Sequence, residues 1–245
     1  MILNIAAYQF VRIADPDAIA ASVRACAEAG ALRGTVLVAP EGINLFLAGE
    51  EDPVHAFLAW LRDDARFESI VVKQSTSRLQ PFARLKVKVK PEIISFRRDG
   101  ASPLDARAPA VSANTLRRWI AQGTDDEGRR LMLLDTRNRE EVGHGTFAGA
   151  LTLPIDNFTE LPEALAPHRE GLRDATVVSF CTGGIRCEKL APWLREDGMD
   201  NLLQLDGGIL AYFAQVGGEG YDGRCFVFDA RVALDPGLKP LVDVA

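Results

Sequence analysis

The sequence predicts an α/β protein built from two domains, and three observations support that prediction. In residues 1–98, apolar runs typical of strands alternate with segments whose apolar residues recur at helical spacing. Residues 99–111 lose this periodicity and contain glycine, proline and several alanines, as a linker does. Beyond residue 111, short apolar runs again alternate with helical segments. A chain of 245 residues is long enough for two separate hydrophobic cores.

The first domain, residues 1–98, is predicted to begin with a strand over residues 2–13. Asp15 and Pro16 then mark a helix start, because aspartate caps the first amides and proline fits the first turn. Further along we predict a hairpin of two strands, at residues 34–39 and 43–48, and then a helix at 52–67. Two more strands are predicted at 70–72 and 85–96. The order strand, helix, strand, strand, helix, strand is typical of a ferredoxin-like α+β sandwich.

The second domain, residues 112–220, contains four short and mostly apolar runs, at 131–135, 150–154, 176–181 and 202–205. Segments with helical character separate them. Buried strands that alternate with helices predict a doubly wound parallel α/β sheet with helices on both faces. Residues 221–245 follow as a C-terminal extension.

The composition is that of an ordinary globular protein, with 47% hydrophobic residues and a net charge of −6. No apolar run approaches the roughly 20 residues of a membrane-spanning helix, and the first residues lack the basic flank of a secretion signal. Four scattered cysteines are too few for a disulfide scaffold, so we expect a reducing, cytoplasmic location. We predict packing roles for Cys26 and Cys225. Three histidines without a Cys-x-x-Cys pair predict no metal site.

Cys181 stands where a predicted strand gives way to a helix, which is where doubly wound folds bind ligands. Two glycines after it allow amide N–H groups to turn toward the sulfur, and these amides, the helix start near Cys187 and Arg186 favour a thiolate. We therefore predict Cys181 and Arg186 as catalytic residues. The predicted active-site loop is Thr182, Gly183, Gly184, Ile185 and Cys187. For Cys181 and Arg186 the alternative stays open that they are a buried cysteine and an unrelated surface arginine. Cys187 is either a resolving thiol or simply a packed side chain.

Four segments in order resemble a rhodanese domain over residues 112–216. They are Asp135-Thr136-Arg137, residues 141–150 leading to Leu153-Pro154, the Cys181 loop, and Leu205-Asp206-Gly207-Gly208. The resemblance implies that Asp135 and Arg137 brace neighbouring loops. Six residues from Cys181 through Arg186 match the sulfurtransferase loop, whereas phosphatase relatives have one residue more, so a phosphatase is disfavoured.

Nearly the whole chain is similar to the tRNA uridine hydroxylases that carry a rhodanese domain. The similarity adds Pro40-Glu41-Gly42-Ile43-Asn44 upstream and Phe226-Val227-Phe228-Asp229 downstream, and it extends the Cys181 loop through Lys189. It implies a ferredoxin-like domain before a rhodanese-like one, and an oxygen-dependent conversion of the wobble uridine of tRNA to 5-hydroxyuridine. Many members continue into a cysteine-rich tail, and residues 230–245 contain no such cluster.

Positive charge is concentrated in one segment of this acidic chain. Residues 66–98 hold nine basic and two acidic side chains. Arg84, Lys86, Lys88 and Lys90 alternate with Leu85, Val87 and Val89, so we predict a row of cations on one face of a strand and apolar side chains in the core. With Arg78, these four cations are the predicted RNA-binding residues. The alternative is a solvated sheet face or an edge strand protected by lysine.

Our working hypothesis is that the Cys181 thiolate adds to C6 of uracil, so that C5 becomes electron-rich and reacts with molecular oxygen as cosubstrate. The hypothesis requires a sulfur that a base can reach, and the sequence shows no evident cofactor. Two other functions stay open, a sulfurtransferase that carries a persulfide on Cys181 and a non-catalytic binding module. The implied partner is the anticodon region of tRNA, with no membrane; the oligomeric state stays open.

Overall fold

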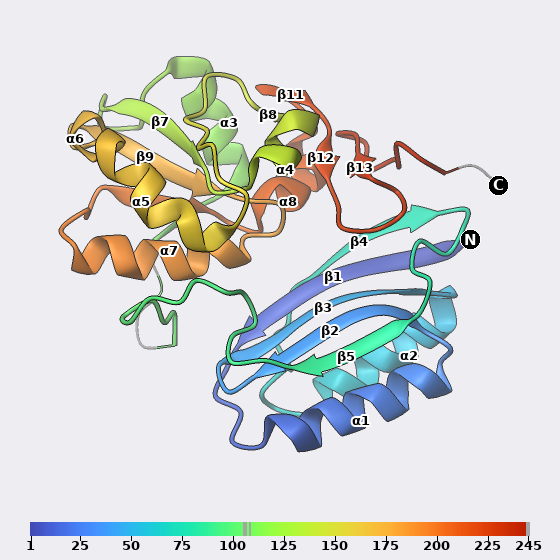
Figure 1. Ribbon diagram of the computed structural model, residues 1–245. Helices are drawn as coiled ribbons and strands as arrows, with labels where there is room; N and C mark the ends of the chain where they lie inside the picture. Colours follow the sequence, from blue (N-terminus) through green and yellow to red (C-terminus); the bar gives the residue numbers. More distant parts are fainter. Residues whose placement is uncertain (105–106, 108, 244–245) are drawn as a thin grey trace. The chain divides into compact units, whose positions relative to one another are not determined.

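The computed structural model describes residues 1–104, 107 and 109–243, which form two compact units (Figure 1). Unit 1 consists of Met1–Ser95 together with Phe228–Val232 and residues 239–243. Unit 2 consists of Phe96–Val227 and Ala233–Leu238. The chain therefore returns twice to unit 1 after completing most of unit 2.

Unit 1 is a five-stranded sheet with two helices. Its elements are β1 (Ile2–Phe10), α1 (Pro16–Ala29), β2 (Arg33–Ala39), β3 (Gly42–Gly49), α2 (Glu51–Arg62), β4 (Val72–Ser77) and β5 (Leu85–Val89). The strand order is β4-β1-β3-β2-β5, and β2 and β5 are parallel while the other pairs are antiparallel. The predicted ferredoxin-like architecture is confirmed, with β5 as an additional edge strand.

Four predicted elements of unit 1 have wrong boundaries. The first strand, predicted at 2–13, ends at Phe10. The second helix ends at Arg62 rather than near residue 67, and a series of turns follows it. The strand predicted at 70–72 begins only at Val72 and continues to Ser77. The strand predicted at 85–96 ends at Val89, since Pro91 lacks the amide that would continue the ladder.

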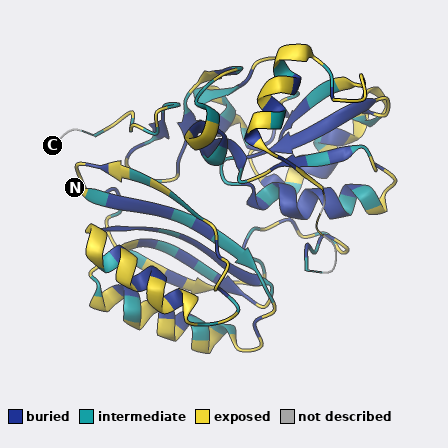
Figure 2. Cartoon of the chain, turned by 180° about the vertical axis from the view of Figure 1, so that it is seen from behind, coloured by how far each residue is buried: buried dark blue, intermediate teal, exposed yellow. Residues whose placement is uncertain are grey.

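Alternate strand residues of unit 1 face α1 and α2, which cover one side of the sheet (Figure 1). In β1, Leu3, Ile5 and Ala7 are at most 7% exposed and share one apolar cluster with Val23 of α1 and Phe57 of α2. The exposed residues of both helices lie on their outer sides (Figure 2). The core of unit 1 therefore lies between one face of the sheet and the two helices, as the alternation of side chains along a strand requires.

Unit 2 is built around a four-stranded sheet in which every pair is parallel. Its strands and helices are β6 (Ala110–Val111), α3 (Ala113–Gln122), β7 (Arg130–Asp135), α4 (Arg139–His144), β8 (Gly145–Phe147), α5 (Leu161–Leu165), α6 (Arg169–Leu172), β9 (Ala175–Phe180), α7 (Ile185–Glu196), β10 (Leu202–Leu205), α8 (Gly208–Val216), β11 (Tyr221–Gly223), β12 (Cys225–Phe226) and β13 (Ala233–Leu234). The sheet order is β6-β10-β9-β7, and the predicted parallel α/β architecture is confirmed.

The sheet of unit 2 differs from the prediction at two strands. Residues 150–154 form no strand and contribute only a single bridge, from Leu151 to Leu134 of β7. The sheet instead gains β6, a two-residue strand at the end of the predicted linker, whose Val111 pairs with Leu205 of β10. The helices α3 and α8 lie on one side of the sheet and α5 and α7 on the other (Figure 1). Within the described part of the chain, no helix has the length and apolar character needed to span a membrane.

Candidate active site

The Cys181 loop connects the carboxyl end of β9 with the start of α7. Phe180 is the last residue of β9, and α7 begins at Ile185, two residues before the helix start predicted near Cys187. Gly184 caps the helix with a φ of 99°, a conformation that residues with a side chain rarely adopt. Because the helix begins earlier than predicted, Arg186 and Cys187 both lie in its first turn.

The sulfur of Cys181 is held by the loop that follows it. The backbone N–H of Gly184 donates to Sγ of Cys181 at 3.1 Å. Burial raises the pKa of Cys181, but the Cys187 thiol, the charge of Arg186 and the amides of Arg186 and Gly184 outweigh burial and lower the pKa to about 6. At neutral pH the sulfur is therefore mainly a thiolate, which is the nucleophilic form of cysteine.

The start of α8 supports this loop. The N–H of Ile209 donates to the carbonyl of Cys181 at 2.9 Å, and the N–H of Leu210 donates to the carbonyl of Thr182 at 3.0 Å. Gly208, with a φ of 67°, lies so close that a Cβ there would be 2.4 Å from the carbonyl oxygen of Cys181. The start of α8, from Gly208 to Leu210, therefore fixes the backbone of the cysteine loop.

Arg186 is held by a carboxylate that the sequence did not reveal as part of the site. Nη1 of Arg186 lies 2.9 Å from Oε2 of Glu141, and Nη2 donates to Oε1 at 3.1 Å. Glu141 is fully buried, and it also forms a reciprocal capping box with Asn138 at the start of α4. The hydroxyl of Thr182 donates to the same carboxylate at 3.3 Å. The pattern Asn138-x-x-Glu141 was the available signal, but it indicates a helix start and not a partner 45 residues away.

Two further cysteines contact the loop. Cys187 is fully buried, lies 3.7 Å from the hydroxyl of Thr136 and donates toward Cys181, and burial together with the neighbouring Cys181 raises its own pKa. Cys225 lies beside the hydroxyl of Thr182, and burial raises the pKa of Cys225 to about 12. Both are therefore neutral thiols near neutral pH, so that Cys181 is the ionised member of the group.

Asp135 and Arg137 form a fully buried ion pair at the end of β7. Nη2 of Arg137 lies 2.6 Å from Oδ2 of Asp135 and donates to the carbonyl of Gly145 at 2.7 Å. The hydroxyl of Thr146 donates to the same carboxylate at 2.7 Å. These bonds join β7 to the segment after α4, which is the bracing role that the sequence implied.

The expectation that solvent reaches the sulfur is wrong for this structure. Cys181 is only 1% exposed, and Gly184 and Cys187 are among the groups in contact with its sulfur. The physical reason is that the same groups that stabilise the thiolate also enclose it. A base can reach the sulfur only after a group that covers it has moved.

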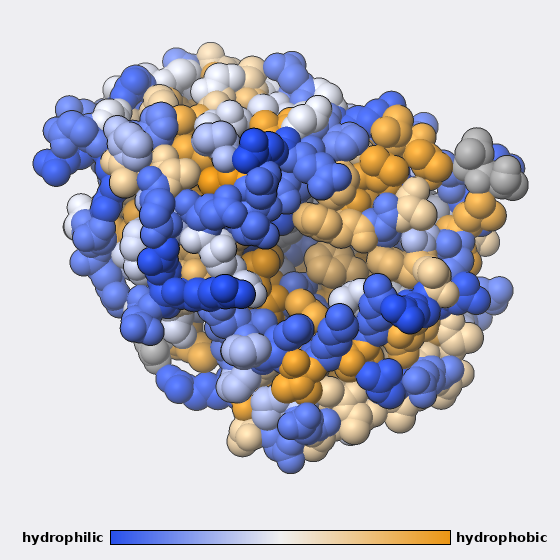
Figure 3. Space-filling model, viewed as in Figure 1, coloured by the Kyte–Doolittle hydropathy of each residue, from blue (hydrophilic) through white to orange (hydrophobic). Residues whose placement is uncertain are grey.

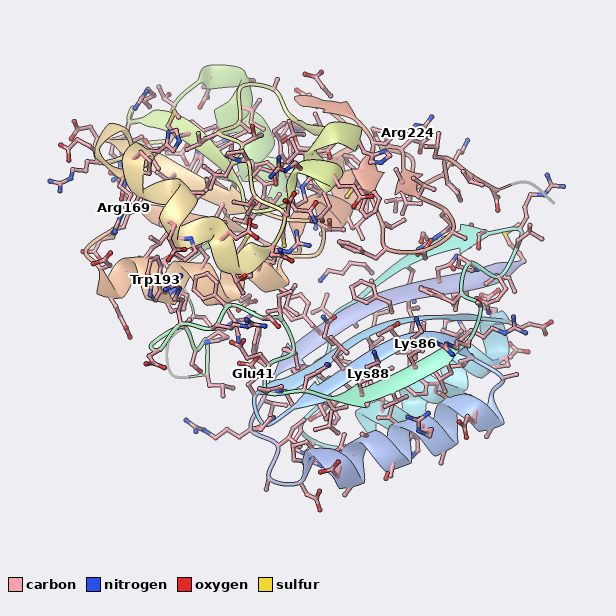
Figure 4. All side chains as sticks on the ribbon, in the orientation of Figure 1. Glu41, Lys86, Lys88, Arg169, Trp193 and Arg224 are labelled. Atoms are coloured by element: carbon pink, nitrogen blue, oxygen red, sulfur yellow. The ribbon has the colours of Figure 1, made fainter. Side chains whose placement is uncertain are left out.

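The five predicted RNA-binding cations all belong to unit 1. Lys86 and Lys88 lie along β5 and are exposed (Figure 4). Arg84 and Lys90 flank this strand, while Arg78 follows β4 at the opposite edge of the sheet. These cations therefore do not form one continuous row.

The predicted alternation along β5 holds in part. Val87 lies in the core at 7% exposure, and Leu85 packs against it. Val89 was expected in the core but is 39% exposed, because the strand ends there. Among the residues that the structure describes, no three histidine, cysteine or acidic side chains converge to hold a metal ion.

Comparison with known proteins identifies relatives of each part and of the whole chain. Residues 2–93 match the model of the UPF0176 acylphosphatase-like domain, and residues 112–215 match that of the rhodanese-like domain. A tRNA uridine(34) hydroxylase of Xanthomonas euvesicatoria pv. vesicatoria (strain 85-10) is 69% identical over 243 residues, which cover 99% of this chain and 98% of the relative. A tRNA uridine(34) hydroxylase of Xylella fastidiosa (strain M23) is 64% identical over 244 residues, which cover 100% of this chain and 95% of the relative.

Proposed function

Since the chain belongs to the tRNA uridine(34) hydroxylase family, we propose that it converts uridine 34 of tRNA to 5-hydroxyuridine with molecular oxygen as cosubstrate. One observation carries the assignment of the reacting group. Sγ of Cys181 accepts the N–H of Gly184 at 3.1 Å, and its pKa is lowered to about 6 despite full burial. A sulfur that is ionised at neutral pH is the strongest nucleophile that the described side chains of unit 2 offer.

In the proposed reaction the Cys181 thiolate adds to C6 of the uracil ring, and the electron pair of the C5–C6 double bond becomes an enolate over C5 and O4. This enolate reacts with oxygen to give a hydroperoxide at C5. A two-electron reductant from outside the chain converts the hydroperoxide to a hydroxyl group and one water. Loss of the C5 proton then expels the thiolate from C6. Uridine, oxygen, two electrons and two protons thereby give 5-hydroxyuridine and water.

The residues around the sulfur have separate tasks in this scheme. The Gly184 amide and the Cys187 thiol stabilise the thiolate before attack and again when it leaves. Arg186 supplies positive charge, and Glu141 fixes the position of its guanidinium. Because Cys181 is 1% exposed, base entry is coupled to an opening movement, which keeps the thiolate from small oxidants in the resting enzyme.

Replacement of Cys181 by alanine tests the proposal. We expect Cys181→Ala to abolish 5-hydroxyuridine formation in tRNA, measured by mass spectrometry of nucleosides, while Cys26→Ala on α1 of unit 1 retains it. The protein should also form a covalent adduct with an anticodon stem-loop that carries 5-fluorouridine at position 34. Full hydroxylation by Cys181→Ala would exclude the proposed mechanism.

Two further measurements on the wild-type protein separate the hydroxylase from a sulfurtransferase. A persulfide on Cys181 would add the mass of one sulfur to the peptide that contains it. Turnover of thiosulfate that does not depend on tRNA would support that second function, since the six-residue loop is compatible with either chemistry.

We further propose that the anticodon region of tRNA is the partner and that the protein acts in the cytoplasm. Two observations support this. The exposed lysines of β5 can neutralise phosphates, and all four cysteines are free thiols, as a reducing compartment favours.

A further inference from the structure

The sheet of unit 1 has a second face that α1 and α2 do not cover. The strand register identifies the side chains on it. Lys73 of β4 pairs with Ala6 of β1, and Ala6 pairs with Phe46 of β3. Phe46 in turn pairs with Thr35 of β2, and Thr35 pairs with Lys86 of the edge strand β5. Paired residues share a face, so these five side chains form one row across all five strands. We call it the transverse row.

A second row runs beside the first. Tyr8 of β1 pairs with Asn44 of β3, Asn44 with Leu37 of β2, and Leu37 with Lys88 of β5. The Nζ of Lys73 lies over the ring of Tyr8, 4.7 Å from its centroid. The two rows together place Tyr8 and Phe46 on the two strands β1 and β3 and place lysines toward both edges of the sheet.

The chain itself limits this face at two places. The Nδ2 of Asn44 donates to the carbonyl of Ile93 at 3.1 Å, so the segment after β5 passes over the second row at Asn44. On β4, Ser75 accepts a hydrogen bond of 2.7 Å from Nη1 of Arg231, which belongs to the part of the chain that returns to unit 1. The transverse row lies between these two contacts, at Asn44 and at Ser75.

The aromatic rings on this face are not explained by the core. The opposite side chains of the same strands, such as Ile5, Val36 and Leu45, are at most 3% exposed, whereas Tyr8 and Phe46 are only half-buried. Lysine on the edge strand β5 can prevent edge pairing, but rings on the inner strands do not serve that purpose. Figure 3 shows hydrophilic side chains over β5 with hydrophobic ones beside them. Half-buried rings on a sheet face that also carries three lysines indicate a binding surface.

We propose that this face, with Tyr8 and Phe46 as its stacking residues, binds unpaired bases of the tRNA substrate. The inference rests on the proposed function for its ligand. Charge complementarity supports the choice of RNA, because Lys73 lies over the ring of Tyr8, Lys86 and Lys88 lie on the edge strand of the same face, and phosphates accompany every base. In the RNA-recognition motif, aromatic side chains on the open face of a four-stranded sheet stack two or three bases in the same manner.

Binding of a single-stranded RNA with the anticodon-loop sequence tests the proposal, with the perfect duplex of that sequence as a second ligand. Phe46→Leu keeps an apolar side chain but removes the ring, so we expect the Kd for the single strand to rise about 5- to 100-fold, as loss of one base–aromatic stack does. Phe46→Tyr should restore wild-type affinity. Trp60→Ala removes an aromatic side chain, 37% exposed, from α2 on the other side of the sheet, and should leave the Kd unchanged.

The salt dependence separates stacking from phosphate contacts. Lys86→Gln and Lys88→Gln should each lower the slope of log K against log salt by about 0.7 for the single strand, whereas Phe46→Leu should leave the slope unchanged. The wild-type protein should prefer the single strand over the duplex, because paired bases offer no faces for stacking. Equal affinity for both RNAs, or an unchanged Kd in Phe46→Leu, would overturn the proposal.

The outcomes distinguish this inference from the proposed function. If Phe46→Leu hydroxylates and binds RNA like wild type while Cys181→Ala is inactive, the stacking surface is wrong and the hydroxylase stands. If wild-type protein binds the single strand through Phe46 but produces no 5-hydroxyuridine, the surface stands and the proposed reaction is wrong. Unchanged alkylation of Cys181 in Phe46→Leu confirms that unit 2 remains folded.

Discussion

The thiol of Cys187 is the group that does most to lower the pKa of Cys181. Burial raises that pKa, and among the opposing causes the Cys187 hydrogen bond comes before the charge of Arg186 and the two backbone amides. Cys187 is the third residue of α7 and is itself buried and neutral. Replacing it by alanine therefore removes a donor without removing a charge.

The size of the effect follows from this geometry. A hydrogen bond to a charged group contributes about 1.5–3 kcal/mol, and about 1.4 kcal/mol corresponds to a tenfold change in the ionisation constant. We therefore expect Cys187→Ala to raise the pKa of Cys181 from about 6 to between about 7 and 8. At pH 7 the thiolate fraction would fall from about 90% in the wild type to between about 50% and 10%.

The pH dependence of alkylation by iodoacetamide measures this pKa. Cysteine is an acid, so the rate should be low below the pKa and reach its plateau above it, and the midpoint in Cys187→Ala should lie at higher pH than in the wild type. Cys187→Ser keeps a donor at the same position and should remain near the wild-type midpoint. A midpoint that is unchanged in the alanine variant, or shifted equally in the serine variant, would refute the assignment of this hydrogen bond.

Two further predictions concern the support of the loop. Gly208→Ala should destabilise the fold by about 3 kcal/mol or more in urea unfolding, since its Cβ would overlap the carbonyl of Cys181; Gly123→Ala, with a similar positive φ but open space, should cost only about 1–2 kcal/mol, and equal losses would contradict the proposed close packing. Glu141→Gln should lower stability by about 3 kcal/mol because it leaves Arg186, whose side chain is only 12% exposed, without its carboxylate, and should move the alkylation midpoint to lower pH; a midpoint at higher pH would show that Glu141 does not offset the charge of Arg186.

Local patterns were sufficient for the fold class and for the position of the nucleophile. The alternation of apolar residues predicted the strands of unit 1, since side chains in a strand point to opposite faces. An apolar run followed by Cys181 and two glycines predicted the turn between β9 and α7, because those glycines permit backbone angles that other residues avoid. In both cases residues close in the sequence determine the structure.

The partners of the loop could not be predicted in this way, because they come from distant segments. Glu141 is 45 residues from Arg186, and Cys225 approaches Thr182 from β12. The two-residue strand β6 is too short to leave a periodic pattern, and it forms only because β10 provides a partner. Burial of the sulfur likewise depends on how Gly184 and Cys187 pack against it, which the order of residues in the motif does not specify.

The origin of the donors around Cys181 determines which part of the site can open. Gly184, Arg186 and Cys187 all follow the sulfur directly and belong to one helix start, so they move together with it. Two residues of other helices contact this loop and helix start: Glu141 of α4 pairs with Arg186, and Gly208 of α8 packs against the carbonyl of Cys181. Because Gly184 and Cys187 also lie against the sulfur, a base reaches Cys181 only when this helix start opens, and any donor that is displaced then no longer lowers the pKa of Cys181. Exposure to solvent acts in the opposite direction, since it lessens the burial that raises this pKa, and so helps to keep the sulfur ionised when a base arrives.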